Sequence, residues 1–351
     1  MNWHEILFFS LFNLFIFAVL FLDLKVIGKN SHVISFKESL IWSIIWILFA
    51  LTFFVLIKYH GDWIHGISDL ERLKEVVKLH DHPIRIDNLD FESALQVYRN
   101  NLALEYLTGY LIEKALSVDN IFVMIMIFIA FGVNPKYYKR VLFWGIIGAV
   151  IMRFIFIFLS AALIQKFSWI LLVFGGLLIF TGVKMFITRN KKEKIEPEKH
   201  PVVKFASKFF SVYPRYVRHH FFIKKDGRNY MTPLFIVLLV IEFSDVIFAV
   251  DSVPAIFSIT KDPYIVYFSN IFAILGLRSL FFLLSNVMNK FRFLKLGLSV
   301  LLTFIGVKMI LHTWLKEIGF TTAHSLYIIL FILTVSIVAS VLIPEKKEIN
   351  H

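Results

Sequence analysis

Residues 232–257 read TPLFIVLLVIEFSDVIFAVDSVPAIF, an apolar stretch interrupted by three carboxylates. Its length suffices for a transmembrane helix, which needs about 20 apolar residues. A carboxylate at the bilayer centre costs about 2.5 to 3.5 kcal/mol, so Glu242, Asp245 and Asp251 are expected to face a bundle interior, a partner or a water-filled cavity. Pro254 follows them and predicts a kink or break in the helix beside Asp251. The stretch therefore predicts a membrane helix with a functional polar face.

The composition of the whole chain points the same way. Of its 351 residues, 58% are hydrophobic and 18% are charged, and the mean hydropathy is +0.75. Soluble domains have about 45 to 50% apolar and about 25% charged residues, so a soluble enzyme is excluded. The chain has no cysteine, which removes disulfides, thiolate metal sites and cysteine nucleophiles. The Walker A, G-x-G-x-x-G, nucleophile-elbow and H-E-x-x-H motifs are also missing, so we expect neither an enzyme nor a bound prosthetic group.

Hydropathy predicts an all-α polytopic membrane protein with about nine transmembrane helices. The predicted spans lie near residues 5–24, 39–57, 104–132, 139–160, 167–187, 232–257, 264–287, 293–313 and 323–343. The chain is accordingly divided into two N-terminal helices (1–57), an extracytoplasmic loop (58–103), a first three-helix unit (104–187), a basic cytoplasmic loop (188–231), a second three-helix unit (232–313), and a C-terminal helix with a short cytoplasmic tail (314–351).

Lys and Arg are concentrated in alternate loops, most densely between Arg189 and Arg228. Cytoplasmic loops hold this excess, so we expect the N-terminus outside and the C-terminus in the cytoplasm of a bacterial inner membrane. The formal net charge of +12 is then explained by topology, and no nucleic-acid partner is expected.

The two three-helix units share anchors at matched positions. Asp119 of the first unit matches Asp251 of the second, and Arg153 matches Arg278. The motif Gly-Val-Lys-Met occurs at 182–185 and again at 306–309. Because each unit has an odd number of spans, the second copy would enter the membrane from the opposite face. The sequence thus predicts an inverted repeat, which in many secondary transporters places the site near the midplane.

Glu113 and Asp119 bring the intramembrane carboxylates to five, whereas Arg153 and Arg278 are the two cations at comparable depth. One interpretation pairs aspartate with arginine in structural salt bridges. Two arginines cannot neutralise five carboxylates, so protonation or a bound cation is required for the rest. Carboxylate, amide and carbonyl oxygens favour hard cations, led by Mn²⁺, Mg²⁺ and Ca²⁺, and we expect Mn²⁺.

Two segments also carry a family resemblance. Residues 113–122 read EKALSVDNIF, and residues 242–256 read EFSDVIFAVDSVPAI. Both resemble the signatures of the TerC family, and the long outer loop with nine spans resembles its Alx-type members; the similarity covers about residues 60–345. The family is named for tellurium resistance, and several members are implicated in manganese export or in supplying Mn²⁺ to exported proteins. The resemblance implies a metal-interacting set of Asp119, Asn120, Asp245 and Asp251, with Glu113 and Glu242 as second choices.

Two hydrophilic loops carry further candidate features. The outer loop contains a mixture of His and Asp that could bind a metal on the exit side, although such side chains are usually solvated: His60, Asp62, His65, His80, Asp81 and His82. In the basic loop, the stretch Val202 to Val212 is compatible with an interfacial helix on anionic lipid or with a flexible tether.

Together these observations predict a gradient-driven exporter of a divalent cation, with Mn²⁺ efflux and metal homeostasis as its role and the lipid bilayer as its surroundings. The rival hypothesis is a membrane scaffold or stress-response protein of the tellurium-resistance type. Its buried charges would be structural, and it would recruit envelope or secretion-machinery partners. Transport of a small organic solute is a third alternative.

Overall fold

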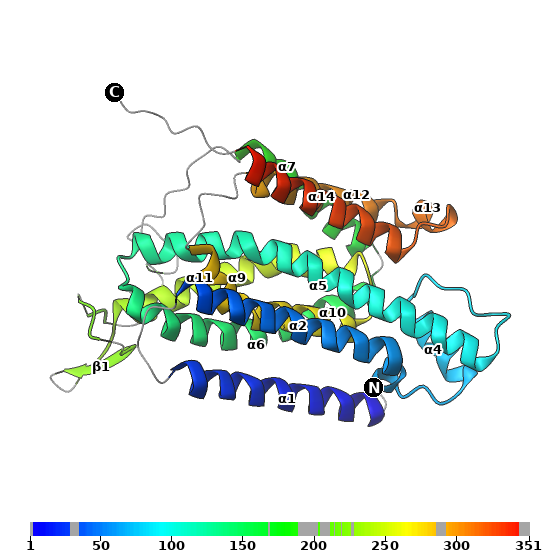
Figure 1. The fold of residues 1–351 in the computed structure, drawn as a ribbon, viewed down its shortest axis with the longest axis horizontal. Coiled ribbons are helices and arrows are strands. Elements are labelled where there is room, and N and C mark those ends of the chain that lie inside the picture. The colour runs from blue at the N-terminus through cyan, green and yellow to red at the C-terminus, as the bar shows by residue number, and fades with distance from the viewer. Residues whose placement is uncertain are drawn as a thin grey trace.

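The computed structural model describes residues 3–28, 35–167, 169–188, 203, 211–213, 215–218, 220–225, 228–285 and 293–343. Helices dominate this part of the chain (Figure 1). Their bounds are α1 Trp3–Gly28, α2 Phe36–His60, α3 Asp62–His65, α4 Leu70–Leu79, α5 Phe91–Ala130, the 3-10 helix η1 Pro135–Tyr137, α6 Tyr138–Lys166, α7 Ile170–Thr188, α9 Pro233–Phe257, α10 Pro263–Leu275, α11 Leu277–Ser285, α12 Leu294–Ile310, α13 His312–Glu317 and α14 Thr322–Leu342. A short antiparallel hairpin joins β1 Phe222–Lys225 to β2 Arg228–Met231.

The chain is a multi-pass membrane protein, but the number of spans differs from the prediction. Among the described residues, six helices are long and apolar enough to cross a membrane, and a seventh span results if α10 and α11 are taken as one bent pair. The described apolar part of α12 is only Leu296–Ile310, which is short for a span. Helix α5 is long, but it carries Glu113, Lys114 and Asp119 close together. Nine spans therefore stay a prediction.

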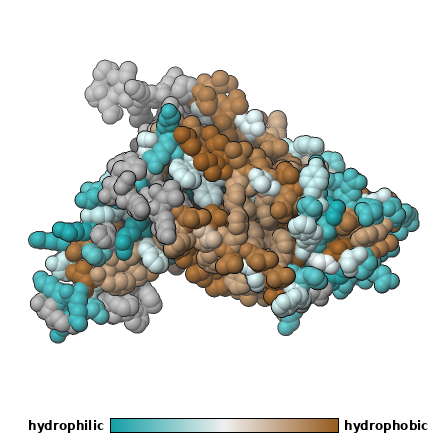
Figure 2. All heavy atoms as spheres, turned by 60° about the horizontal axis from the view of Figure 1, so that its bottom comes forward, coloured by the Kyte–Doolittle hydropathy of each residue, from teal (hydrophilic) through white to brown (hydrophobic). Residues whose placement is uncertain are grey.

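The surface of the molecule fits this assignment. Hydrophobic residues cover its middle, and hydrophilic residues gather at its two ends (Figure 2). Large apolar side chains point outward from the helices of this belt, for example Leu14 on α1, Phe180 on α7 and Phe331 on α14, each more than 60% exposed. A soluble monomer rarely exposes so large an apolar surface, whereas lipid tails solvate it.

The helices pack in a reciprocal pattern around the long helix α5. Helix α5 packs against α10, α6 packs against α9, and α7 packs extensively against α12. In Figure 1, α7, α12 and α14 lie together on one side of α5, and α1 lies on the other side of the bundle. The first helix of each predicted unit therefore contacts the second helix of the other unit, and the two third helices contact each other.

Glycines allow α7 and α12 to approach closely. A Cβ atom at Gly306 would lie 2.7 Å from the carbonyl oxygen of Gly175, and one at Gly182 would lie 2.8 Å from that of Ser299. Small residues at a membrane helix interface permit such backbone contact. Gly182 and Gly306, the glycines of the repeated Gly-Val-Lys-Met motif, thus both serve the same helix–helix contact.

The predicted break beside Asp251 does not occur. Helix α9 continues through Pro254 and ends at Phe257, although the proline has no N–H to donate to the carbonyl of Val250. The kink that Pro254 also predicts stays a prediction. A 43° bend instead separates α10 from α11, at the junction that contains Gly276 and precedes Arg278.

Candidate functional site

A buried polar cluster joins four helices in the interior of the bundle. We call Glu113 (α5), Arg153 (α6), Asp245 and Ser252 (α9) and Asn270 (α10) the central cluster. Arg153 Nη1 donates to Glu113 Oε1 at 2.7 Å, to Ser252 Oγ at 2.7 Å and to Asn270 Oδ1 at 3.1 Å. Its Nη2 lies 3.5 Å from Asp245 Oδ1, and Asn270 Nδ2 donates to Glu113 Oε2 at 3.2 Å. One guanidinium therefore links three helices to α6.

The central cluster is buried and carries one more carboxylate than guanidinium. Arg153 is 1% exposed, and Glu113 and Asn270 are fully buried. Asp245 Oδ2 is a buried oxygen with no hydrogen-bond partner among the described side chains, and the same holds for Ser117 Oγ, one helical turn after Glu113. Because unpaired buried oxygens are costly, these atoms are available to a cation or a proton.

The remaining predicted residues do not all join this cluster. Asp251 accepts a hydrogen bond from Thr181 Oγ1 on α7 at 3.0 Å. It lies six residues after Asp245, which turns it about 120° around α9. Glu242 is partly buried beside Gly148 of α6, where its carboxylate fills the space that a Cβ would need.

The other members of the predicted set lie on α5 and α11. Asn120 is buried on α5, and Arg278 is buried on α11. Asp119 is part of α5, but its side chain lies outside the described residues, so its predicted metal contact stays a prediction. The predicted interfacial helix Val202 to Val212 likewise falls almost wholly outside the described residues.

A second buried cluster lies where α3 and α4 meet the turn between α9 and α10. We call His65, His80, His82, Glu105 and Asp262 the histidine cluster; each is at most 5% exposed. His65 Nε2 lies 2.8 Å from Asp262 Oδ2, and His82 Nδ1 lies 2.9 Å from Glu105 Oε1. Asp62 and Asp81 are instead paired with Arg99 and Lys261, and His60 stacks on Trp63.

Sequence reasoning noticed three histidines of this cluster but expected such residues to be solvated, and it missed Asp262 and Glu105. A signal was present, because Asp262 precedes Pro263 and a helix, which is the pattern of an N-cap. Glu105 stands alone in an apolar part of α5, where a carboxylate needs partners, and it accepts from Asn101 Nδ2 at 2.7 Å and Thr260 Oγ1 at 2.6 Å.

Burial and pairing set the proton affinities in the histidine cluster. Burial lowers the pKa of His65, but the carboxylates of Asp262 and Glu5 outweigh it and raise this pKa to about 9. For Asp262, burial raises the pKa, but His65 and the neighbouring histidines hold it well below its usual range. Burial lowers the pKa of His80. His65 and Asp262 therefore form a charged pair, whereas His80 is neutral at pH 7.

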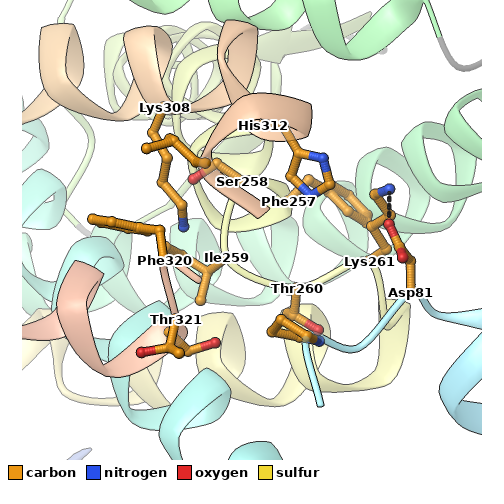
Figure 3. Close-up of a pocket in the computed structure, with 13 residues that line it drawn as sticks. Asp81, Phe257, Ser258, Ile259, Thr260, Lys261, Lys308, His312, Phe320 and Thr321 are labelled. Atoms are coloured by element: carbon orange, nitrogen blue, oxygen red, sulfur yellow. Dashed lines mark hydrogen bonds and ion pairs between the residues drawn. The ribbon is translucent and has the colours of Figure 1, made fainter. Parts of the chain in front are cut away.

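A small cavity is lined by residues that neighbour the histidine cluster in sequence, among them Asp81 and Lys261 (Figure 3). It lies between the α9–α10 turn, α12, α13 and the start of α14, and its volume of about 50 Å³ has room for a few water molecules. Lys308 of the repeated Gly-Val-Lys-Met motif extends into it, and the Asp81–Lys261 ion pair borders it. Lys308 is only 9% exposed.

Comparison with known proteins identifies the relatives of this chain. The model of the integral membrane protein TerC family matches residues 98–348. The chain belongs to the TerC family. An uncharacterized membrane protein of Myxococcus xanthus is 42% identical to this TerC-family chain over 328 residues, which cover 93% of the chain and 90% of the relative. A "Putative membrane-bound redox modulator Alx" of Salmonella typhi is 38% identical over 338 residues, which cover 96% of the chain and 94% of the relative. No solved structure matches the chain.

The TerC match includes the whole central cluster, but only part of the histidine cluster. His65, His80 and His82 precede residue 98, whereas Glu105 and Asp262 follow it. The alignment to the Salmonella relative nevertheless covers 96% of this TerC-family chain.

Proposed function

We propose that this TerC-family protein is a gradient-driven exporter that carries a divalent metal cation, principally Mn²⁺, out of the cytoplasm. The observation that carries the proposal is the central cluster, in which Glu113 and Asp245 face one guanidinium inside the membrane-embedded bundle. In this proposal the metal is the transported substrate, and the protein neither catalyses a reaction nor uses a prosthetic group.

The donor atoms of the cluster suit a hard cation. Carboxylate, amide and hydroxyl oxygens are supplied by Glu113, Asp245, Asn270 and Ser252, and thiolates are missing from the chain. Such a set favours Mn²⁺, Mg²⁺ or Ca²⁺ over softer metals. A cation bound at Asp245 Oδ2 would occupy a buried oxygen that otherwise lacks a partner among the described side chains.

An inverted repeat would explain why the cluster lies where it does. The matched acids Glu113 and Asp245, each six residues before Asp119 and Asp251, contact the same Arg153. The exchanged packing of α5 with α10 and of α6 with α9 supports a two-fold relation between the units. In that architecture, one unit rocks against the other and opens a midplane site to alternate sides.

The same carboxylates provide a route for energy coupling. When the metal leaves, the one carboxylate in excess of the guanidinium is left buried without a counter-charge, so each transport cycle exchanges metal for a proton. We place the N-terminus and the α3–α4 end outside a bacterial inner membrane, because the basic segment then lies in the cytoplasm.

The test is total cellular manganese, measured by elemental analysis after Mn²⁺ challenge, in cells with and without the protein. We expect the native chain to lower cell manganese and Asp245→Asn to abolish this effect. Glu92→Gln is the matched control, because Glu92 is an exposed carboxylate on α5, far along the chain from Glu113. Unchanged metal content across the divalent series, despite membrane insertion, rejects the exporter.

The rival function is a membrane scaffold that recruits envelope or secretion partners, and the pairing of Arg153 with two carboxylates favours it. A scaffold needs only the salt bridge, so exchanging the charges by Glu113→Arg with Arg153→Glu should restore folding and function. An exporter should fold but not transport with the charges exchanged. The redox role named for the Alx relatives would have to act without thiols in this chain, because it contains no cysteine.

A further inference from the structure

The histidine cluster has a feature that its internal ion pairs do not explain. His80 is 5% exposed, and its Nδ1 is a buried nitrogen without a hydrogen-bond partner among the described residues. Its ring lies 5.1 Å from the ring of His65, and His65 in turn contacts Asp262. Leaving an imidazole nitrogen buried and unpaired costs free energy, which a ligand at this position would recover.

The ligand atoms are close enough to share one ion. His65, His80 and Asp262 each offer one nitrogen or oxygen, and these three atoms all lie within 4.8 Å of one another. We propose that these residues form a second metal site, which binds a divalent transition-metal ion through two imidazoles and one carboxylate. In the metal-bound state, the ion replaces the proton shared by His65 Nε2 and Asp262 Oδ2.

Neighbouring groups already hold two of the ligands in position. Glu5 Oε1 lies 3.3 Å from His65 Nδ1, and Arg72 Nη2 donates to the same Glu5 oxygen at 3.0 Å. A carboxylate on the far nitrogen of a ligating histidine fixes its tautomer and orientation. The amide of Tyr264 donates to Asp262 Oδ1 at 2.9 Å, which leaves Oδ2 directed at His65.

The donor set selects a different class of metal from that of the central cluster. Two imidazoles with one carboxylate suit Zn²⁺ and neighbouring ions such as Co²⁺, whereas the central cluster presents oxygens only. The three ligands come from the end of α3, the end of α4 and the N-cap of α10. Binding would therefore clamp the N-terminal segment onto the TerC-matched part of the chain, and this proposal does not depend on export.

The test uses the purified full-length protein, with any polyhistidine tag removed and metal stripped by a chelator. Co²⁺ titration followed by visible absorption reports nitrogen and oxygen ligation, and Zn²⁺ calorimetry reports affinity. We expect the native protein to bind one ion at this site, with a rise in unfolding temperature because the ion binds the folded state. His80→Ala and Asp262→Asn should each weaken binding at least about tenfold.

The controls separate this site from other histidines and from the transport site. His60→Ala, which removes an exposed histidine of the same end, and Asp245→Asn in the central cluster should keep native Co²⁺ and Zn²⁺ binding. If His80→Ala does not fold, His80→Gln replaces it with a side chain of similar volume. Failure of the native protein to bind either ion, or native affinity in both cluster variants, overturns the proposal. If the cell assay shows no manganese export but the purified protein binds Co²⁺ or Zn²⁺ as expected, the proposed function fails and the second metal site is still supported.

Discussion

The carboxylate of Glu113 on α5 and the guanidinium of Arg153 on α6 lie 2.7 Å apart, and both side chains are at most 1% exposed. A pair so deeply buried is stable only because further groups complete it. The same guanidinium also contacts Ser252 and Asp245 on α9 and Asn270 on α10. These contacts hold α9 and α10 to α6.

Removal of Arg153 should therefore be severe. Arg153→Leu leaves Glu113 and Asp245 buried without a cation, and we expect a loss of about 3 to 5 kcal/mol, seen as a lower unfolding temperature in detergent. Arg153→Lys should also destabilise, because one ammonium cannot reproduce the planar fork that contacts both carboxylates. Arg85→Leu, at an exposed arginine, is the control. Equal stability of the Arg85 and Arg153 variants would show that the cluster does not hold the helices.

Gly148 of α6 is predicted to position Glu242. A methyl group at Gly148 would overlap the carboxylate of Glu242, so Gly148→Ala should displace that side chain or separate α6 from α9. We expect a lower unfolding temperature, corresponding to about 1 to 3 kcal/mol. Gly176→Ala on α7 is the matched control, since nothing lies within 4 Å of its Cβ position. The interpretation fails if the two alanine variants melt alike.

The contact between α7 and α12 should depend on Gly306. Gly306→Ala would place a Cβ 2.7 Å from the Gly175 carbonyl oxygen, and backbone cannot yield as a flexible side chain can. We expect reduced thermal stability, again against Gly176→Ala, together with weaker cross-linking between cysteines introduced on the two helices. Unaltered cross-linking would mean that the interface tolerates wider spacing.

The ion pair between Asp81 and Lys261 should matter little. Its atoms are 2.7 Å apart, but the side chains are 33% and 26% exposed, so solvent screens the interaction. We expect Asp81→Asn to change stability by about 0 to 1 kcal/mol in thermal unfolding. A larger loss would indicate that this pair supports the neighbouring cavity.

Much of the architecture follows from the sequence. The apolar runs gave the membrane class and most helix positions, because hydrocarbon requires long helices whatever their neighbours. Six or seven spans are found among the described residues, and the two further spans predicted at α5 and α12 stay predictions. Pro254 does not break α9, which continues to Phe257, and the kink that it also predicts stays a prediction.

For the two sites too, the sequence determined one part and the tertiary structure decided the other. That Glu113, Asp245 and Arg153 must find partners followed from the cost of a charge in the bilayer. That these three residues contact one another was decided by the packing of α5, α6, α9 and α10. This packing brings side chains that are far apart in sequence close together. The histidine cluster was decided by tertiary structure still more fully, because His65 and Asp262 are separated by 197 positions, and local sequence carries no information about burial between such distant segments.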